Sequence, residues 1–473
     1  MKIPIAVALG LLAALAPPVA APSLRAASAQ RPAPGNGNGA AHPAHDAPAL
    51  AIAPFESLRR DPRYDWLGEG LAELAVEHLS GVRGSDGEQI HAPVFPREEW
   101  LAALERMGLP ASARFSRATL LKIAVEMDAD GLVFGRYSTD GTALTISARV
   151  LHISPASLSA EITQSGPLGD VLELQARLVW QLRNLLAPPS AHRACCPAPG
   201  KGRFPSRMDA FEQYVRGATA ADEPARIRLL REAARLDPQW ELPAFALGKA
   251  YLARRDCTNA LPWFERVEGE DSWRAAESAF YAGLCLLQQG QASRAQRVLT
   301  ARSDATPLPE QLNNLGVALL RQGLWLDAAE TLERAVALEP DIAEAWFNLG
   351  QAKYWHGASL PGWRGDSGIR ALREALRQEP RDLEVRAWLA VALDRAGRPS
   401  EAAVVREQAP GALPSVPAGS PVSPTRPAKG KGAAAENAGT PAAPYTRLGR
   451  MKTALDPHWR TRGRHSDADG ERR

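Results

Sequence analysis

Cysteine is scarce in this sequence, with four residues in a chain of 473. None of their spacings matches a C-x-x-C, haem or zinc pattern, and the nine histidines include no H-E-x-x-H motif. The sequence therefore predicts no metal site and no cofactor. Cys257 and Cys285 fall in neighbouring repeats of a helical region described below. An oxidising compartment would permit a disulfide between them, but the sequence leaves this open.

A large excess of charge of one sign is missing as well, since the formal net charge is only +3. This balance gives no indication of a nucleic-acid partner, and we expect none. Basic residues do outnumber acidic ones beyond Ala409, in a stretch rich in proline, glycine and alanine. We interpret residues 409–473 as a disordered basic tail, with contact to an acidic surface as the alternative.

Long apolar runs are absent after the N-terminus. The run Ile3–Ala16 follows Lys2 and ends at two prolines, and the A-x-A sequence Ala27-Ser28-Ala29 comes soon after it. This pattern predicts a signal peptide over residues 1–29 and a periplasmic or otherwise exported protein, with no integral membrane segment after signal removal. An uncleaved N-terminal helix that anchors the chain is the alternative. Residues 30–48 have no periodic apolar pattern and predict a disordered linker.

The segment 49–186 alternates the patterns of strands and helices. Apolar runs of strand length lie at 50–55, 89–95, 132–137, 144–153 and 158–163, and helical spacing occurs at 71–79, 96–107, 117–127 and 168–186. This order predicts an N-terminal α/β domain, a mixed sheet with helices. Glu69 and Glu73 suit the first turn and exposed face of its first helix. A second linker, 187–204, follows.

Part of this segment resembles a known family. The first strand, the sequence Asp-Trp-Leu-Gly-Glu-Gly at 65–70, the helix after it, and the run DADGLVFGRYSTDGTALTISARVLHI at 128–153 carry the resemblance. Together they are similar to the amino-terminal domain of the periplasmic TolB family, over residues 49–186. The resemblance implies assembly and partner contact in the cell envelope rather than catalysis. TolB continues into a β-propeller and this chain does not, so TolB's own role is not implied.

The region 205–408 repeats itself. An apolar residue followed by glycine recurs at steps of 35, 33 and 34 residues, with the glycines at 248, 283, 316 and 350. This period is typical of tetratricopeptide repeats, which are pairs of antiparallel helices. The best copy, 309–342, has small residues where the two helices must approach closely and Pro340 where the second helix ends. We predict five to six helix pairs stacked as an all-α superhelix, with about six extra residues around His356–Ile369 placed in a loop.

Stacked pairs of this kind form a concave groove lined by the first helix of each pair. The groove is the default site for a protein or peptide partner, held as an extended segment or a helix. The family's groove positions correspond here to nine candidate partner-binding residues: Phe245, Lys249, Phe280, Asn313, Val317, Arg321, Phe347, Gln351 and Tyr354.

Sequence motifs of catalytic sites are weak compared with the repeat pattern. Gly365-Asp366-Ser367-Gly368 looks like the nucleophile loop of trypsin-like proteases, but its helical surroundings favour a surface loop. No catalytic residues are predicted, and we expect a non-enzymatic, exported scaffold for protein–protein interaction. The alternative is a small-molecule sensor or enzyme that uses a cleft of the α/β domain. The partner's identity, the biological process and the oligomeric state do not follow from the sequence.

Overall fold

A computed structural model describes residues 49–59, 61–80, 94–110, 113–186, 204–267, 273–303, 308–358, 365–409, 411, 449–453 and 455. The expected signal peptide, the linker 30–48, residues 187–203 with Cys195 and Cys196, and most of the tail 409–473 lie outside these ranges. Among the helices that are described, none is both long and apolar enough to cross a membrane.

The first domain contains one mixed sheet. Its strands are β1 (Leu50–Ile52), β2 (Glu56–Ser57), β3 (Gly131–Thr139), β4 (Ala143–His152), β5 (Ser157–Leu158) and β6 (Ile162–Pro167). β1 and β2 pair with β3 in parallel, whereas β3–β4, β4–β5 and β4–β6 are antiparallel. The mixed sheet agrees with the sequence prediction. The single strand predicted at 158–163 is instead divided between β5 and β6. Of the strand predicted at 89–95, residues 89–93 lie outside the described residues, and Val94 forms a bridge to Leu50.

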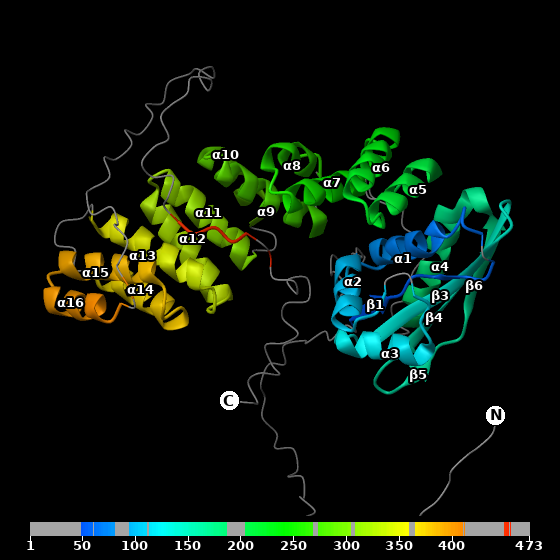
Figure 1. The fold of residues 1–473 in the computed structure, drawn as a ribbon, viewed down its shortest axis with the longest axis horizontal. Coiled ribbons are helices and arrows are strands. Elements are labelled where there is room, and N and C mark those ends of the chain that lie inside the picture. The colour runs from blue at the N-terminus through cyan, green and yellow to red at the C-terminus, as the bar shows by residue number, and fades with distance from the viewer. Residues whose placement is uncertain are drawn as a thin grey trace, which may run out of the picture. The chain divides into compact units, whose positions relative to one another are not determined.

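Helices cover both faces of this sheet (Figure 1). They are α1 (Trp66–Leu79), α2 (Arg97–Arg106), α3 (Arg117–Glu126) and α4 (Val171–Leu186). Side chains alternate between the faces along each strand. Leu50, Ile52 and Val133 thus belong to the core with α1 and α4, while Ala51 and Leu132 belong to a second core with α2 and α3.

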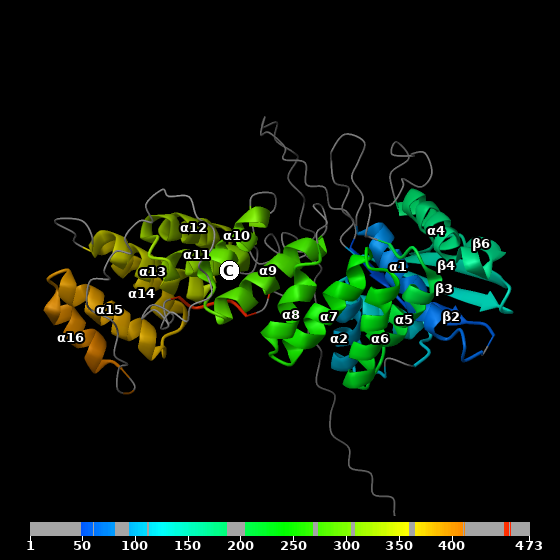
Figure 2. The ribbon, with the colours of Figure 1, turned by 90° about the horizontal axis from the view of Figure 1, so that it is seen from above.

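The described residues between 204 and 409 are largely helical and form successive antiparallel pairs (Figures 1 and 2). The first helices of the six pairs are α5 (Met208–Ala218), α7 (Glu241–Ala253), α9 (Trp273–Gln288), α11 (Pro309–Arg321), α13 (Ala343–Ala358) and α15 (Leu383–Arg395). The second helices are α6 (Glu223–Leu236), α8 (Cys257–Phe264), α10 (Ala292–Ser303), α12 (Trp325–Leu338), α14 (Asp366–Gln378) and α16 (Pro399–Glu407).

The recurring glycine marks the closest approach of the two helices in a pair. A Cβ atom on Gly316 would lie 2.5 Å from Leu332 of α12, and Gly248, Gly283 and Gly350 meet Phe264, Leu299 and Leu372 at 2.5–2.6 Å. Only a residue without a side chain fits at such a distance. The repeat period in the sequence is therefore a period of helix contact.

The loop of extra residues expected around His356–Ile369 falls largely outside the described residues, since α13 ends at Ala358 and 359–364 lie outside them. One expectation beside it was wrong. Gly365-Asp366-Ser367-Gly368 is not a surface loop: Gly365 has φ +74° at the N-cap and the other three residues form the first turn of α14. Gly368 is buried, where a Cβ would lie 3.3 Å from the Gly350 carbonyl oxygen. Packing between the two helices fixes this conformation.

The α/β domain packs directly on the first repeat pairs. Phe211 of α5 contacts Gly70 and stacks edge-on against Trp66, both on α1, with ring centroids 5.5 Å apart. An ion pair between Glu77 and Arg274 is buried at the same junction. Glu69 and Glu73 accordingly do not lie on an exposed face. Glu69 pairs with Arg97 at 2.6 Å, and Glu73 accepts a hydrogen bond from the Tyr214 hydroxyl at 3.3 Å.

A disulfide joins Cys257 and Cys285, with the Cα atoms 5.1 Å apart. Cys257 opens α8 and Cys285 lies near the end of α9, so the bond connects two successive repeat pairs. It closes a loop of 28 residues in the unfolded chain. A loop of this size corresponds to about 3–4 kcal/mol of stabilisation in the chain-entropy model.

We expect the C257A/C285A variant to lose about 3 kcal/mol of unfolding free energy, because its unfolded state is no longer cross-linked. Urea unfolding of both proteins, with and without dithiothreitol, measures this. Reductant should destabilise the wild type and a C195A/C196A control but not C257A/C285A. Equal sensitivity of all three proteins to reductant would contradict the assignment.

Candidate peptide-binding groove

A short segment of the C-terminal tail lies against the first helices of the repeats. It comprises Gly449–Thr453 and Leu455, and it is the red segment beside α11 and α13 in Figures 1 and 2. Its contacts extend from Phe280 on α9 to Glu384 on α15. We call these residues the tail segment and the surface that they contact the groove.

Three buried asparagines bind the backbone of the tail segment. Asn348 accepts the Arg450 N–H at 2.7 Å and donates to the Arg450 carbonyl at 2.9 Å. Asn314 makes the same pair of bonds with Lys452, at 2.8 and 2.9 Å, and Asn313 donates to the Arg450 carbonyl at 3.0 Å. Alternate residues present their N–H and C=O to the same side in an extended chain. The asparagines therefore recognise an extended backbone.

These bonds also satisfy the asparagines themselves. Asn313, Asn314 and Asn348 have no solvent-exposed surface. A buried amide side chain needs a partner for its oxygen and its nitrogen, because leaving one unpaired costs about 1–3 kcal/mol. The Asn348 amide also donates to Asn313 at 2.8 Å, which links α13 to α11. The hydrogen bonds of these three amides are thus satisfied in large part by main-chain atoms of the tail segment.

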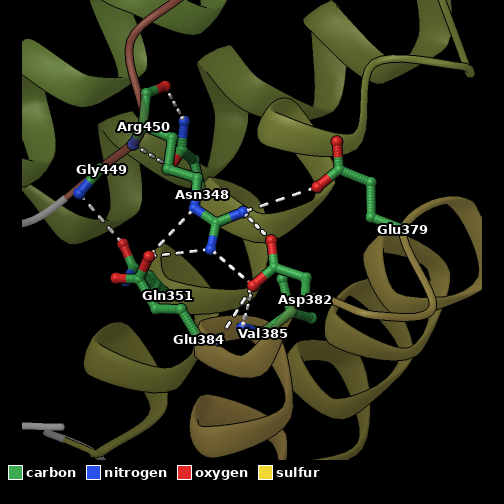
Figure 3. A network of polar contacts seen from close by, with 8 residues as sticks. All are labelled: Asn348, Gln351, Glu379, Asp382, Glu384, Val385, Gly449 and Arg450. Carbon is green, nitrogen blue, oxygen red and sulfur yellow. Dashed lines mark hydrogen bonds and ion pairs between the residues drawn. The ribbon is translucent and has the colours of Figure 1, made fainter. Parts of the chain in front are cut away.

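The Arg450 side chain occupies an acidic slot, seen in Figure 3. Its guanidinium donates to both oxygens of Asp382, one bond measuring 2.9 Å, and to Glu384 at 2.8 and 3.2 Å. Glu379 approaches to 3.8 Å, and the Phe347 ring lies under the guanidinium with its centroid 4.1 Å away. A planar fork of donors between carboxylates and over an aromatic face is the geometry that arginine fits better than lysine.

The charges in this slot stabilise each other. Burial alone would raise the pKa of Asp382, but hydrogen bonds from Arg450 and from the Val385 N–H outweigh it and lower that pKa to about 2. Burial would lower the pKa of Arg450, and the hydrogen bonds to Asp382 and Glu384 instead raise it. Asp382 and Arg450 are therefore both ionised at neutral pH.

Three further contacts fix the register of the tail segment. Gly449 donates its N–H to the Gln351 side chain at 3.2 Å, and a Cβ there would lie 2.8 Å from Val317. Lys452 forms an ion pair with Glu344 at 2.9 Å. Leu455 is buried against Phe280 and Leu308. The three contacts depend on the missing side chain of Gly449, the positive charge of Lys452 and the apolar side chain of Leu455.

The nine candidate residues named from the repeat pattern divide into two groups. Phe280, Asn313, Val317, Phe347 and Gln351 contact the tail segment. The other four have different neighbours. Lys249 lies over the Phe245 ring and pairs with Glu98 at 3.0 Å and Glu277 at 3.3 Å. Arg321 donates to the Leu287 carbonyl, and Tyr354 is buried beside Trp355 and Trp388.

The sequence interpretation missed the tail segment, which it placed within a disordered region, and it missed the acidic slot. Asp382 and Glu384 read as the N-terminal capping residues of α15, and Asp382 does cap that helix. A usable signal was present in the asparagines. Asn314 and Asn348 are separated by one repeat and lie on the buried face of a first helix, where an amide is costly without a partner.

The α/β domain borders a second hollow, a cavity of about 1220 Å³ between β2, β3 and the helices α5 and α6. Some of its charged lining residues pair with each other, as in Arg136–Glu161 at 2.7 Å and Arg114–Glu56 at 3.2 Å. Burial raises the pKa of Glu69 there, although Arg97 opposes this. Within the residues that the structure covers, no group of three or more His, Cys, Asp or Glu side chains could hold a metal ion.

A family model described as tetratricopeptide repeat matches residues 245–305, 313–357 and 364–417. The helical region is therefore built from tetratricopeptide repeats, and the interpretation of the glycine period is confirmed. Similar solved structures include the crystal structure of MamA protein, at 20% identity and TM-score 0.31, covering 36% of this chain and 88% of that one. Another is YrrB, "a TPR protein with an unusual peptide-binding site", at 16% identity and TM-score 0.33, covering 38% and 89%. No curated protein sequence matches the chain.

Gly449 offers a test of the docked geometry. Its φ is +79°, a conformation that costs an L-residue about 1–2 kcal/mol, and a Cβ would also meet Val317. We expect Gly449→Ala to increase the undocked fraction of the tail segment about tenfold. The rate of trypsin cleavage after Arg450 and Lys452, followed by mass spectrometry, measures this fraction.

Gly430→Ala is the matched control, because it makes the same change in the same tail outside the tail segment. Its cleavage rate at Arg450 and Lys452 should equal that of the wild type. An unchanged rate in Gly449→Ala would mean that the tail segment is not held as described.

Proposed function

We propose that this protein is an exported scaffold that holds other proteins in the cell envelope through an extended segment bound in the groove, without catalysing a reaction. The observation that carries the proposal is the set of paired hydrogen bonds from Asn314 and Asn348 to main-chain atoms two residues apart. Such bonds depend on backbone geometry and accept any extended chain. A repeat surface with this property is suited to peptide capture.

Two observations support the exported location. The disulfide between Cys257 and Cys285 is of the kind that persists in oxidising compartments such as the periplasm. The resemblance of residues 49–186 to TolB-type domains points to the same compartment. Packing of α1 on α5 further suggests that the α/β domain and the repeats act as one binding unit.

A small-molecule sensor remains the second candidate, because the cavity beside β2 and β3 is large enough for a ligand. Its walls carry arginine and glutamate side chains in pairs, and a ligand would have to compete with these pairs. A thermal-shift screen with nucleotides and other small anions tests this candidate. A reproducible, concentration-dependent rise in melting temperature would favour it.

The scaffold proposal predicts that the N313A/N348A variant loses its partners, because two buried amides that bind the backbone are removed. The measurement is affinity capture from envelope extract with the full-length wild type and variant, quantified by mass spectrometry. We expect partner recovery to fall about tenfold or more, the loss expected for several hydrogen bonds of about 1 kcal/mol each.

Asn184→Ala, on α4 of the α/β domain, is the control for a simple loss of an amide. Circular dichroism and thermal unfolding verify that all three proteins are folded. If the N313A/N348A variant recovers the same proteins in the same amounts as the wild type, the groove is not the partner site.

A further inference from the structure

The groove already contains a ligand, and that ligand belongs to the same chain. The main chain of Arg450 and Lys452 is bound by asparagines. Gly449 and the side chains of Arg450, Lys452 and Leu455 each contact a different part of the groove. Residues 412–448 connect it to Gly411, the last described residue after the repeats. A partner that uses this groove meets an occupied site.

The slots specify what such a partner must look like. The position against Val317 takes only glycine, because a Cβ would come within 2.8 Å of that side chain. The next position faces Asp382, Glu384 and the Phe347 ring, which together fit an arginine.

Two more positions follow along the segment. Glu344 lies opposite the residue two places after the arginine and pairs with a lysine there. Phe280 and Leu308 enclose the residue five places after the arginine, which is a leucine in the tail segment. The asparagines add affinity for any extended backbone, so these four positions supply the selectivity.

We propose that the groove binds a partner segment of the form Gly-Arg-x-Lys-x-x-Leu in an extended conformation, and that the tail segment is a tethered copy of that ligand which the partner must displace. The inference rests on the proposed function, since it names the ligand class and the regulation of the same groove. The tail keeps the groove closed to weaker, non-matching segments.

The tether makes this competition effective. A ligand covalently linked to its site has an effective concentration on the order of 1 mM, so a tail segment with an intrinsic dissociation constant of about 10 μM would weaken the binding of a free peptide about 100-fold. Release of the tail segment restores the intrinsic affinity. Strong binding therefore requires either a better ligand or a weakened tail.

The test uses a fluorescent synthetic peptide with the sequence of residues 447–455 and the full-length protein throughout. Fluorescence anisotropy gives its affinity for the wild type, for Arg450→Glu and for the double variant Gly449→Val/Arg450→Glu. The introduced carboxylate faces Asp382 and Glu384 and expels the tail segment. Arg426→Glu makes the same charge change in the tail outside the tail segment and serves as the matched control.

We expect the peptide to bind Arg450→Glu and the double variant about 100-fold more tightly than it binds the wild type or Arg426→Glu. A peptide with lysine in place of arginine at the second position of the motif should bind Arg450→Glu at least tenfold more weakly than the parent peptide. Asp382→Asn in the Arg450→Glu background should reduce binding of the parent peptide by a similar factor.

Any of three affinity results would overturn the inference. They are equal affinity for the wild type, Arg450→Glu and the double variant, no binding to any of these proteins, or no preference for arginine over lysine. Tail exchange between copies would show as dimers of the wild type in sedimentation, and it would also overturn a tether that acts within one chain. If the inference fails while N313A/N348A still loses its envelope partners, the scaffold function stands with a different ligand. If the peptide behaves as expected and the partners are unaffected by N313A/N348A, the scaffold function fails instead.

Discussion

Close contact between the two helices of each repeat is the constraint on which the rest of the structure depends. Gly248, Gly283, Gly316 and Gly350 let a bulky side chain of the second helix touch the backbone of the first. Because this contact recurs every 33 to 35 residues along the chain, every pair stacks on the next in nearly the same way. Equivalent positions of successive first helices then line up on one surface.

The groove is a direct consequence of that alignment. Asn314 and Asn348 occupy equivalent positions one repeat apart, each two residues before a repeat glycine. Asn348 exchanges two hydrogen bonds with the main chain of Arg450. Asn314 reaches Lys452, two residues further along the tail segment. A ladder of amides with the spacing of an extended chain arises because the repeat geometry sets the distance between helices. Electrostatics adds direction, since the acidic residues at the start of α15 hold the guanidinium of Arg450 at one end.

Because the tail segment of the same chain occupies the groove, the groove differs physically from an empty peptide-binding site. The polar groups that would be costly to bury without partners are satisfied before any other protein arrives. Two basic residues of the tail, Arg450 and Lys452, offset part of the negative charge of a surface that gathers Glu344, Asp382 and Glu384. The chain as a whole is nearly neutral in charge, yet its tail segment is basic and the part of the groove that binds this segment is acidic.

Sequence patterns alone predicted the repeat class, the number of helix pairs to within one, and the mixed sheet of the first domain. These features follow from local periodicity, because glycine spacing and apolar alternation report which faces of a helix or strand are buried. The sequence also pointed to Phe280, Asn313, Val317, Phe347 and Gln351 as groove residues. The contacts that those residues make depend on how distant parts of the chain fold together. The contact between Arg450 and Asp382 joins positions 68 residues apart, one of them beyond the repeats, and local patterns carry no information about such a pair. The burial of Glu69 and Glu73, the helical start at Gly365 and the disulfide between Cys257 and Cys285 were settled in the same way, by which surfaces the stacked helices bring together.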